Sequence, residues 1–130
     1  MKADLEALAD RVEALTGPDR EVDARICILL GLSHGNVMAD VDGWCINSAT
    51  NPNPYRSPAY TASLDAAMTL VPGGWVYSLR GEGDWYLASL MEPPSYCSTL
   101  STKVEGRSNA SLAIALTAAA LRAQAAQSER

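Results

Sequence analysis

The amino-acid sequence predicts an α+β protein in which an N-terminal helical hairpin is followed by an α-β-β-β-α unit with a three-stranded antiparallel sheet. Apolar residues recur with helical spacing near both ends of the chain, and strand-like segments lie between residues 75 and 104. Short glycine-rich or proline-rich connections separate these segments, which favours antiparallel neighbours. We expect a single domain over residues 1–130, because a chain of this length accommodates one hydrophobic core.

Residues 1–31 are expected to form the helical hairpin. Apolar residues recur every three or four positions from Leu5 to Leu15, with charged residues on the other face. Gly17 can end this helix, and Pro18 fits the first turn of a second helix that extends to about Leu30. The link is short, so the helices should run antiparallel. Self-association through the first helix is the alternative use of its apolar stripe.

Residues 32–59 are expected to form a loop that contains a short hairpin. Two short apolar segments, 37–39 and 44–46, flank the turn signal Asp42-Gly43. The run from Asn51 to Pro54 excludes helix and favours extended turns. Because long loops in compact domains are often functional, we expect partner-specific contacts in this segment.

Residues 60–126 are expected to form the α-β-β-β-α unit. Thr61 is the expected N-cap of a short helix, which Pro72-Gly73-Gly74 ends. The strand-like segments that follow are residues 75–79, 85–91 and 96–104. Polar residues alternate along the third segment, which predicts a more exposed strand at the edge of the sheet.

The last helix is expected over residues 110–124, with Ser108 or Asn109 as its cap. One stripe is formed by Leu112, Ala115, Leu116 and Ala119, with Ile114, Ala118 and Leu121 beside it, and most of the other positions are alanine. Alanine has the highest helix propensity, and its small side chain lets a helix lie close to a sheet.

The charge balance disfavours nucleic acid as a partner. The chain has 10 Lys and Arg against 15 Asp and Glu, a net charge of -5, and an acidic chain repels phosphate backbones. The order helix, three strands, helix also describes the double-stranded RNA-binding domain, which carries basic residues at the start of its last helix. The corresponding residues here, 109–112, have no charge.

The cysteines and the N-terminus indicate a cytosolic protein with reduced thiols. Cys27, Cys45 and Cys97 form no CxxC pair, and we expect each to be a small buried hydrophobe. The first 15 residues are charged and amphipathic, unlike a signal peptide. The apolar runs are too short to span a membrane, so no membrane attachment is expected.

No group of residues points to catalysis. His34 is the only histidine and lies in a glycine-flanked polar loop, which supports neither a hydrolytic triad nor a metal site. Asp40 and Asp42 match the first acids of a calcium loop, but its closing glutamate is missing. The glycines at 81 and 83 do not precede a helix, so they form no dinucleotide fingerprint. We expect a non-enzymatic protein without a cofactor or metal.

Binding residues are therefore the remaining candidates. Trp44, Tyr55 and Tyr60 lie in or beside the 32–59 loop, and exposed Trp and Tyr are typical anchors of protein interfaces. For a small anionic ligand such as a nucleotide, the candidate phosphate contacts are Arg56, Arg80 and Arg107.

Three stretches carry a family resemblance. PAYTASLDAAMTLVPGGW (58–75), SNASLAIALTAAALRAQ (108–124) and TGPDREVDARI (16–26) resemble segments of small tailed-phage and prophage proteins of unknown function, grouped around the phage α/β/α (ABA) sandwich domain. These motifs are caps, helix faces and turns, and they bring no catalytic or ligand-binding residue. The resemblance implies a phage gene product that acts in the host cytoplasm.

Three functions remain open on these grounds. The first is a binding protein that contacts a host or phage protein, for example to inhibit a host defence or regulatory complex. The second is a sponge that holds a small nucleotide signal at the interface of a homo-oligomer. The third is a structural or assembly accessory protein of the phage particle.

Overall fold

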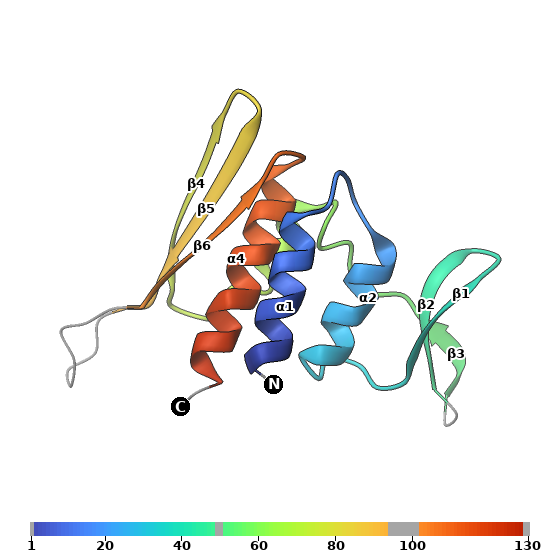
Figure 1. Ribbon diagram of the computed structural model, residues 1–130. Coiled ribbons are helices and arrows are strands. Elements are labelled where there is room, and N and C mark those ends of the chain that lie inside the picture. Colours follow the sequence, from blue (N-terminus) through green and yellow to red (C-terminus); the bar gives the residue numbers. More distant parts are fainter. Residues whose placement is uncertain (1, 49–50, 94–101, 129–130) are drawn as a thin grey trace.

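The computed structural model describes residues 2–48, 51–93 and 102–128 (Figure 1). These residues form two three-stranded antiparallel sheets with helices between them. The α+β class predicted from the sequence is confirmed, but the sequence predicted only one of the two sheets.

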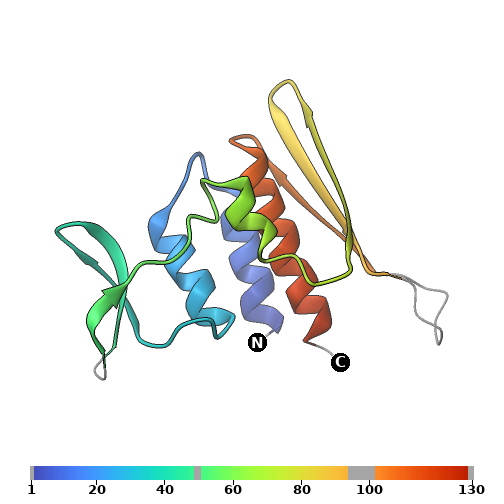
Figure 2. The ribbon, with the colours of Figure 1, turned by 180° about the vertical axis from the view of Figure 1, so that it is seen from behind.

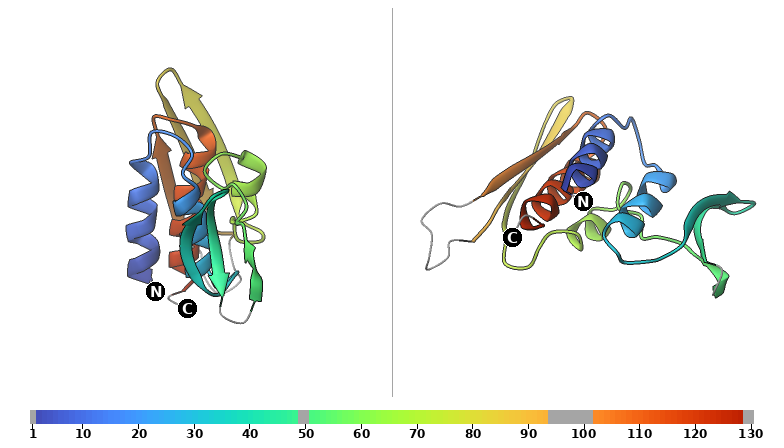
Figure 3. Two further views of the ribbon diagram at one scale, coloured as in Figure 1. Left: turned by 90° about the vertical axis from the view of Figure 1, so that its right-hand side faces the viewer. Right: turned by 60° about the horizontal axis from the view of Figure 1, so that its bottom comes forward.

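The N-terminal helices are α1 (Lys2–Glu13) and α2 (Arg20–Leu29), and the C-terminal helix is α4 (Leu112–Gln127). Figures 1 and 3 show α1 and α4 side by side, with α2 beyond α1 and running in the opposite direction to it. The predicted antiparallel helical hairpin is therefore present. Its first helix packs chiefly along α4, the last element of the chain.

The helix α4 is buried on nearly every side, between α1 and a sheet. Its buried positions include Ile114, Leu116 and Leu121, and most of the others are alanine. A helix that is apolar all round requires cover on several sides. Gly106 lies against this helix so closely that a Cβ there would collide with the backbone carbonyl of Ala115. Small side chains on α4 and a glycine on the facing strand thus set the distance between helix and sheet.

The sheet that packs on α4 contains β4 (Val76–Glu82), β5 (Trp85–Met91) and β6 (Lys103–Ser108), in that order. The β4–β5 hairpin was predicted, and the third strand lies at an edge as expected. It begins at residue 103, so only the end of the predicted 96–104 strand coincides with it; residues 94–101 lie outside the described residues. β4, at the opposite edge, is more exposed than β6, contrary to expectation.

The second sheet lies within residues 32–59 and contains β1 (Asn36–Asp40), β2 (Gly43–Ser48) and β3 (Asn51–Tyr55). The predicted hairpin around Asp42-Gly43 is confirmed as β1 and β2. The third strand corrects the prediction of a loop, because the run of alternating prolines adds β3 as an edge strand. Proline lacks an N–H, which an edge strand tolerates on its unpaired side.

The N-caps of two helices lie two or three residues after the predicted positions. The short helix α3 (Leu64–Met68), visible in Figure 2 in front of the other helices, is capped by Ser63, whose Oγ accepts from the N–H of Ala66 at 3.2 Å. Thr61, the predicted cap, is buried in other contacts. The helix α4 is capped by Ser111 and not by Ser108 or Asn109.

A cluster of charges joins α1, α4 and β6. Arg122 on α4 donates to both carboxylate oxygens of Glu13, at 2.7 and 2.8 Å, and to the backbone carbonyl of Glu105 at 2.7 Å. Glu13 also accepts the backbone N–H of Arg107 at 2.8 Å. The hydrogen bond from Arg122 is the main reason that the pKa of Glu13 lies below its ordinary value of 4.5. We call Glu13 and Arg122 the edge clamp, because they bond the outward backbone groups of β6.

The contact at Gly106 gives a prediction about stability. Replacing Gly106 with alanine should lower the free energy of unfolding by about 1–3 kcal/mol, because the new Cβ forces α4 away from the sheet. Gly17→Ala is the matched control, since a Cβ there meets no atom within 4 Å, and its effect should stay within about 0.5 kcal/mol. Urea denaturation measures both. Equal effects of the two substitutions would contradict the close packing.

The edge clamp gives a prediction about pH. Because the folded-state pKa of Glu13 is lowered, its stabilising contribution is present above about pH 5 and is lost as the pH falls through the folded-state pKa. The stability advantage of the wild type over Glu13→Gln should therefore shrink between about pH 6 and pH 3 in urea denaturation. In an Arg122→Gln background the same comparison should lose most of its pH dependence. A pH-independent advantage in the wild-type background would contradict the assignment.

Candidate functional site

The face of the β4–β5–β6 sheet that points away from α4 is the strongest candidate for a binding surface. Side chains alternate along each strand, and Ala88, Leu90 and Gly106 point toward α4. No described helix or strand covers the other side of this sheet (Figures 1 and 2). We call it the outer face; it consists of Val76, Ser78, Arg80, Glu82, Trp85, Leu87, Ser89, Met91, Lys103, Glu105 and Arg107.

Apolar side chains lie at both ends of the outer face and at Leu87 between them. Val76 is 62% exposed and its cross-strand neighbour Met91 is 43% exposed. Trp85 and Leu87 are half-buried on the same side of β5. A shallow hollow of about 330 Å³ lies on this sheet, lined by residues of all three strands. The surface therefore offers apolar area and some concavity to a ligand or partner.

Positive charge frames this apolar area. One cross-strand row consists of Arg80, Leu87 and Arg107. The two arginines therefore lie on either side of Leu87, with their Cα atoms about 10 Å apart. The Arg80 guanidinium lies 6.0 Å from the centre of the Trp85 ring. The ion pairs Arg80–Glu82 at 3.9 Å and Lys103–Glu105 at 3.5 Å are exposed. Three cations and two carboxylates make the outer face slightly positive on a chain whose net charge is -5.

The structure brings together two of the three arginines predicted to contact phosphate. Arg80 and Arg107 share the outer face, whereas Arg56 lies beside the other sheet. Arg56 donates to both oxygens of Asp40, at 2.8 and 3.0 Å, and to the carbonyl of Trp44 at 3.1 Å. The hydrogen bonding from the Arg56 guanidinium to its carboxylate lowers the pKa of Asp40. The guanidinium of Arg56 thus ties β3 to the β1–β2 hairpin and is separated from the other two arginines.

The three predicted aromatic anchors lie in different environments. Trp44 is half-buried on β2, and Tyr55, at the end of β3, is 45% exposed. Tyr60 is only 2% exposed, so its prediction as an anchor is wrong: the ring belongs to the core. Its hydroxyl lies 3.4 Å from the sulfur of Cys27, and its carbonyl accepts from the hydroxyl of Thr117 at 3.0 Å.

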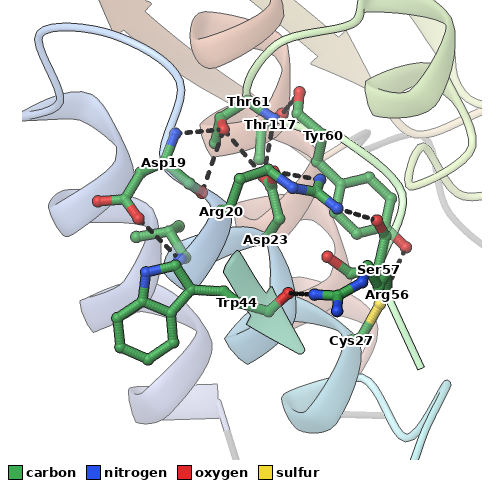
Figure 4. Close-up of polar contacts among 11 residues, drawn as sticks. Asp19, Arg20, Asp23, Cys27, Trp44, Arg56, Ser57, Tyr60, Thr61 and Thr117 are labelled. Atoms are coloured by element: carbon green, nitrogen blue, oxygen red, sulfur yellow. Dashed lines mark hydrogen bonds and ion pairs between the residues drawn. The ribbon is translucent and has the colours of Figure 1, made fainter. Parts of the chain in front are cut away.

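A buried polar network holds the segment around Tyr60 against α2 (Figure 4). Asp23 is fully buried, and one of its oxygens accepts from both the N–H and the hydroxyl of Thr61, each at 2.9 Å. Arg20 donates to the other oxygen at 2.9 Å and to the carbonyl of Ser57 at 2.6 Å. Burial raises the pKa of the Asp23 carboxyl, against the hydrogen bonds from Thr61 and Arg20.

This network is suited to holding the fold together and is poorly placed for chemistry on a substrate. Asp23 and Thr61 have no exposed surface, and their hydrogen bonds are used within the chain. Cys27 is a free thiol in the core, and burial raises its pKa, which keeps it protonated and a weak nucleophile. Burial likewise raises the pKa of Tyr60. Cys45 is also free and buried, as predicted, and Cys97 lies outside the described residues.

Comparison with known proteins returns no match: no family model, no curated protein and no solved structure is similar to this chain. The resemblance to tailed-phage proteins therefore rests on the sequence motifs alone. Among residues 2–48, 51–93 and 102–128, no group of three or more His, Cys, Asp or Glu side chains could hold a metal ion. The helices of the described chain include none that is long and apolar enough to cross a membrane.

Sequence reasoning missed the outer face, although the sequence carries a signal for it. Strand β5 reads WYLASLM, which is apolar at both odd and even positions. A strand with one solvated face alternates apolar and polar residues, whereas a strand covered on both faces is apolar throughout. The interface anchors predicted from the sequence, Trp44, Tyr55 and Tyr60, lie in or beside the 32–59 segment instead.

Proposed function

We propose that the chain is a non-enzymatic binding protein that recognises a protein partner through the outer face. The composition of β5 is the observation that supports this proposal. Its inner side chains pack toward α4, while Trp85, Leu87 and Met91 have the composition of a covered face and lie on the open side. A partner would supply the missing cover.

The chemistry of the outer face favours one kind of partner: an apolar surface segment flanked by carboxylates. Trp, Met and Arg are enriched in protein interfaces, and this face carries all three types. Arg80 and Arg107 would meet carboxylates of the partner on either side of Leu87. The exposed Lys103–Glu105 ion pair at the margin would remain solvated, as is typical of an interface rim.

The proposal includes the setting implied by the sequence motifs. A phage or prophage product that acts in the host cytoplasm would bind a host protein, and inhibition of a defence or regulatory complex is the role that we propose. A small chain without an evident catalytic group inhibits by occupying a surface, so its effect depends on the affinity of one contact face.

The first test compares two methionines of equal exposure on different sheets. Met91 on the outer face and Met38 on β1 are each 43% exposed. In pull-downs from bacterial lysate, Met91→Lys should lose a protein that the wild type retains, because a buried lysine charge disrupts an apolar contact. Met38→Lys should retain it. Quantitative mass spectrometry of the captured proteins measures the difference.

Circular dichroism should confirm that both methionine variants are folded before capture. If Met91→Lys captures the same proteins as the wild type, the outer face is not the binding surface. If neither the wild type nor Met38→Lys captures any protein, the protein-binding proposal fails.

A second candidate function is supported by the cross-strand row of Arg80, Leu87 and Arg107. Two arginines on either side of Leu87, with the Trp85 ring next to one of them, suit a small nucleotide. Its base would stack on the aromatic ring and its phosphate would contact an arginine. The face is open rather than enclosed, so this reading requires a ligand held by charge and stacking.

Thermal shift with linear and cyclic nucleotides tests the second candidate. A nucleotide present at about 100 times its dissociation constant should raise the melting temperature by roughly 5 °C or more. Arg107→Gln should abolish the shift, and Arg25→Gln on α2 is the control that should preserve it. If no nucleotide raises the melting temperature, or if Arg107→Gln responds as the wild type does, the nucleotide reading is wrong.

A further inference from the structure

Edge strands expose unpaired backbone groups, and this chain closes some of its sheet edges. The outward backbone of β6 is bonded by the edge clamp: Glu13 accepts the N–H of Arg107, and Arg122 donates to the carbonyl of Glu105. The edge strand β3 contains two prolines, and β1 has only five residues. Prolines, charged side chains and short length are the usual means of preventing edge-to-edge pairing.

The edge at β4 has only one of these protections, the charged side chains of Arg80 and Glu82. The strand has seven residues and no proline. The orientation of its backbone follows from the edge clamp. Because the N–H of Arg107 points away from β5, the backbone groups of its cross-strand partner Leu87 point away from β6, toward β4. They therefore form hydrogen bonds with the backbone groups of Arg80. The backbone groups of Tyr77, Leu79 and Gly81 therefore face outward. Within the described residues, no group outside the sheet bonds them.

We propose that β4 pairs with β4 of a second copy of this chain, antiparallel, across a two-fold axis at Leu79. This register pairs the whole strand. Leu79 faces Leu79, and Tyr77 faces Gly81 of the other copy. These pairs exchange two hydrogen bonds each, since their backbone groups point outward. A register centred one residue later would place Arg80 opposite Arg80, where like charges repel.

The side chains of β4 fit this register. Tyr77 is 53% exposed although it lies on the face of the sheet that packs on α4. Gly81 already lies under a tyrosine within its own sheet, because its cross-strand partner Tyr86 comes within 3.1 Å of the position of a Cβ. In the dimer, Tyr77 of the second copy would cover the other side of Gly81. The two-fold axis makes this aromatic contact twice.

The symmetry of the contact limits the assembly to two chains. Both copies use the same strand, so the interface is isologous and is complete after one pairing. The far edge of each sheet is β6, which the edge clamp closes. The product is a continuous six-stranded sheet with two outer faces side by side. This inference is independent of the identity of any partner of the outer face.

The test measures self-association of the full chain by sedimentation equilibrium. The wild type should be a dimer at a protein concentration of about 100 µM. Tyr77→Pro removes one outward N–H and leaves the β4–β5 hydrogen bonds intact, because the N–H of Tyr77 does not point toward β5. It should raise the dissociation constant by about 10- to 50-fold, since two hydrogen bonds are lost per dimer. Tyr77→Ala, which keeps the N–H, should raise it less.

A second measurement tests the register by oxidation of single cysteine variants. Leu79→Cys should form a disulfide-linked dimer, because residue 79 faces its own copy. Tyr77→Cys should not exceed the wild-type background, because the two residues 77 would be about 14 Å apart, beyond the reach of a disulfide of about 7 Å. A monomeric wild type at 100 µM, equal effects of proline and alanine at position 77, or equal cross-linking of the two cysteine variants would overturn the proposal.

Discussion

The close packing of α4 against the β4–β5–β6 sheet is the constraint on which the rest of the structure depends. The helix is buried on nearly all sides, and its alanines allow the backbone of β6 to approach at Gly106. One side of this helix serves the sheet and another serves α1. A larger residue on either surface would separate helix and sheet and would expose the core residues Leu90 and Ile114.

In this arrangement the helices cover only one face of the β4–β5–β6 sheet (Figures 1 and 2). All the helices lie on one side of it, so the inner face is buried and the outer face is left to solvent (Figures 1 and 2). The same asymmetry applies to the edges. The charges that fix α1 to α4 also close the backbone of β6, while nothing in the described chain performs this task for β4. The outer face and the β4 edge are therefore both open to a binding partner, and they are neighbouring parts of one sheet.

Buried polar contacts, together with the apolar packing of Ile46, hold the smaller sheet and the segment that follows it against the core. The carboxylate of Asp23 accepts hydrogen bonds from the N–H and the hydroxyl of Thr61. Arg20 donates to the same carboxylate and to the carbonyl of Ser57. Asp23, Arg20 and Thr61 each have a hydrogen-bond partner in this network, which therefore specifies one position for the 57–61 segment. On the far side of that segment, Arg56 ties β3 to Asp40 and fixes the smaller sheet internally.

The sequence alone determined the elements that depend on local chemistry. Helical periodicity, the Asp42-Gly43 turn and the glycine-rich link between β4 and β5 identified most helices and two hairpins.

Tertiary structure decided the rest, because those features depend on partners distant in the chain. Tyr60 is polar-tipped and loop-flanked in sequence, yet it is buried because Cys27 and Thr117 approach it. Thr61 could cap a helix, but its hydroxyl donates a hydrogen bond to Asp23 instead. The row of Arg80, Leu87 and Arg107 exists only once strand register is set, which no local pattern specifies.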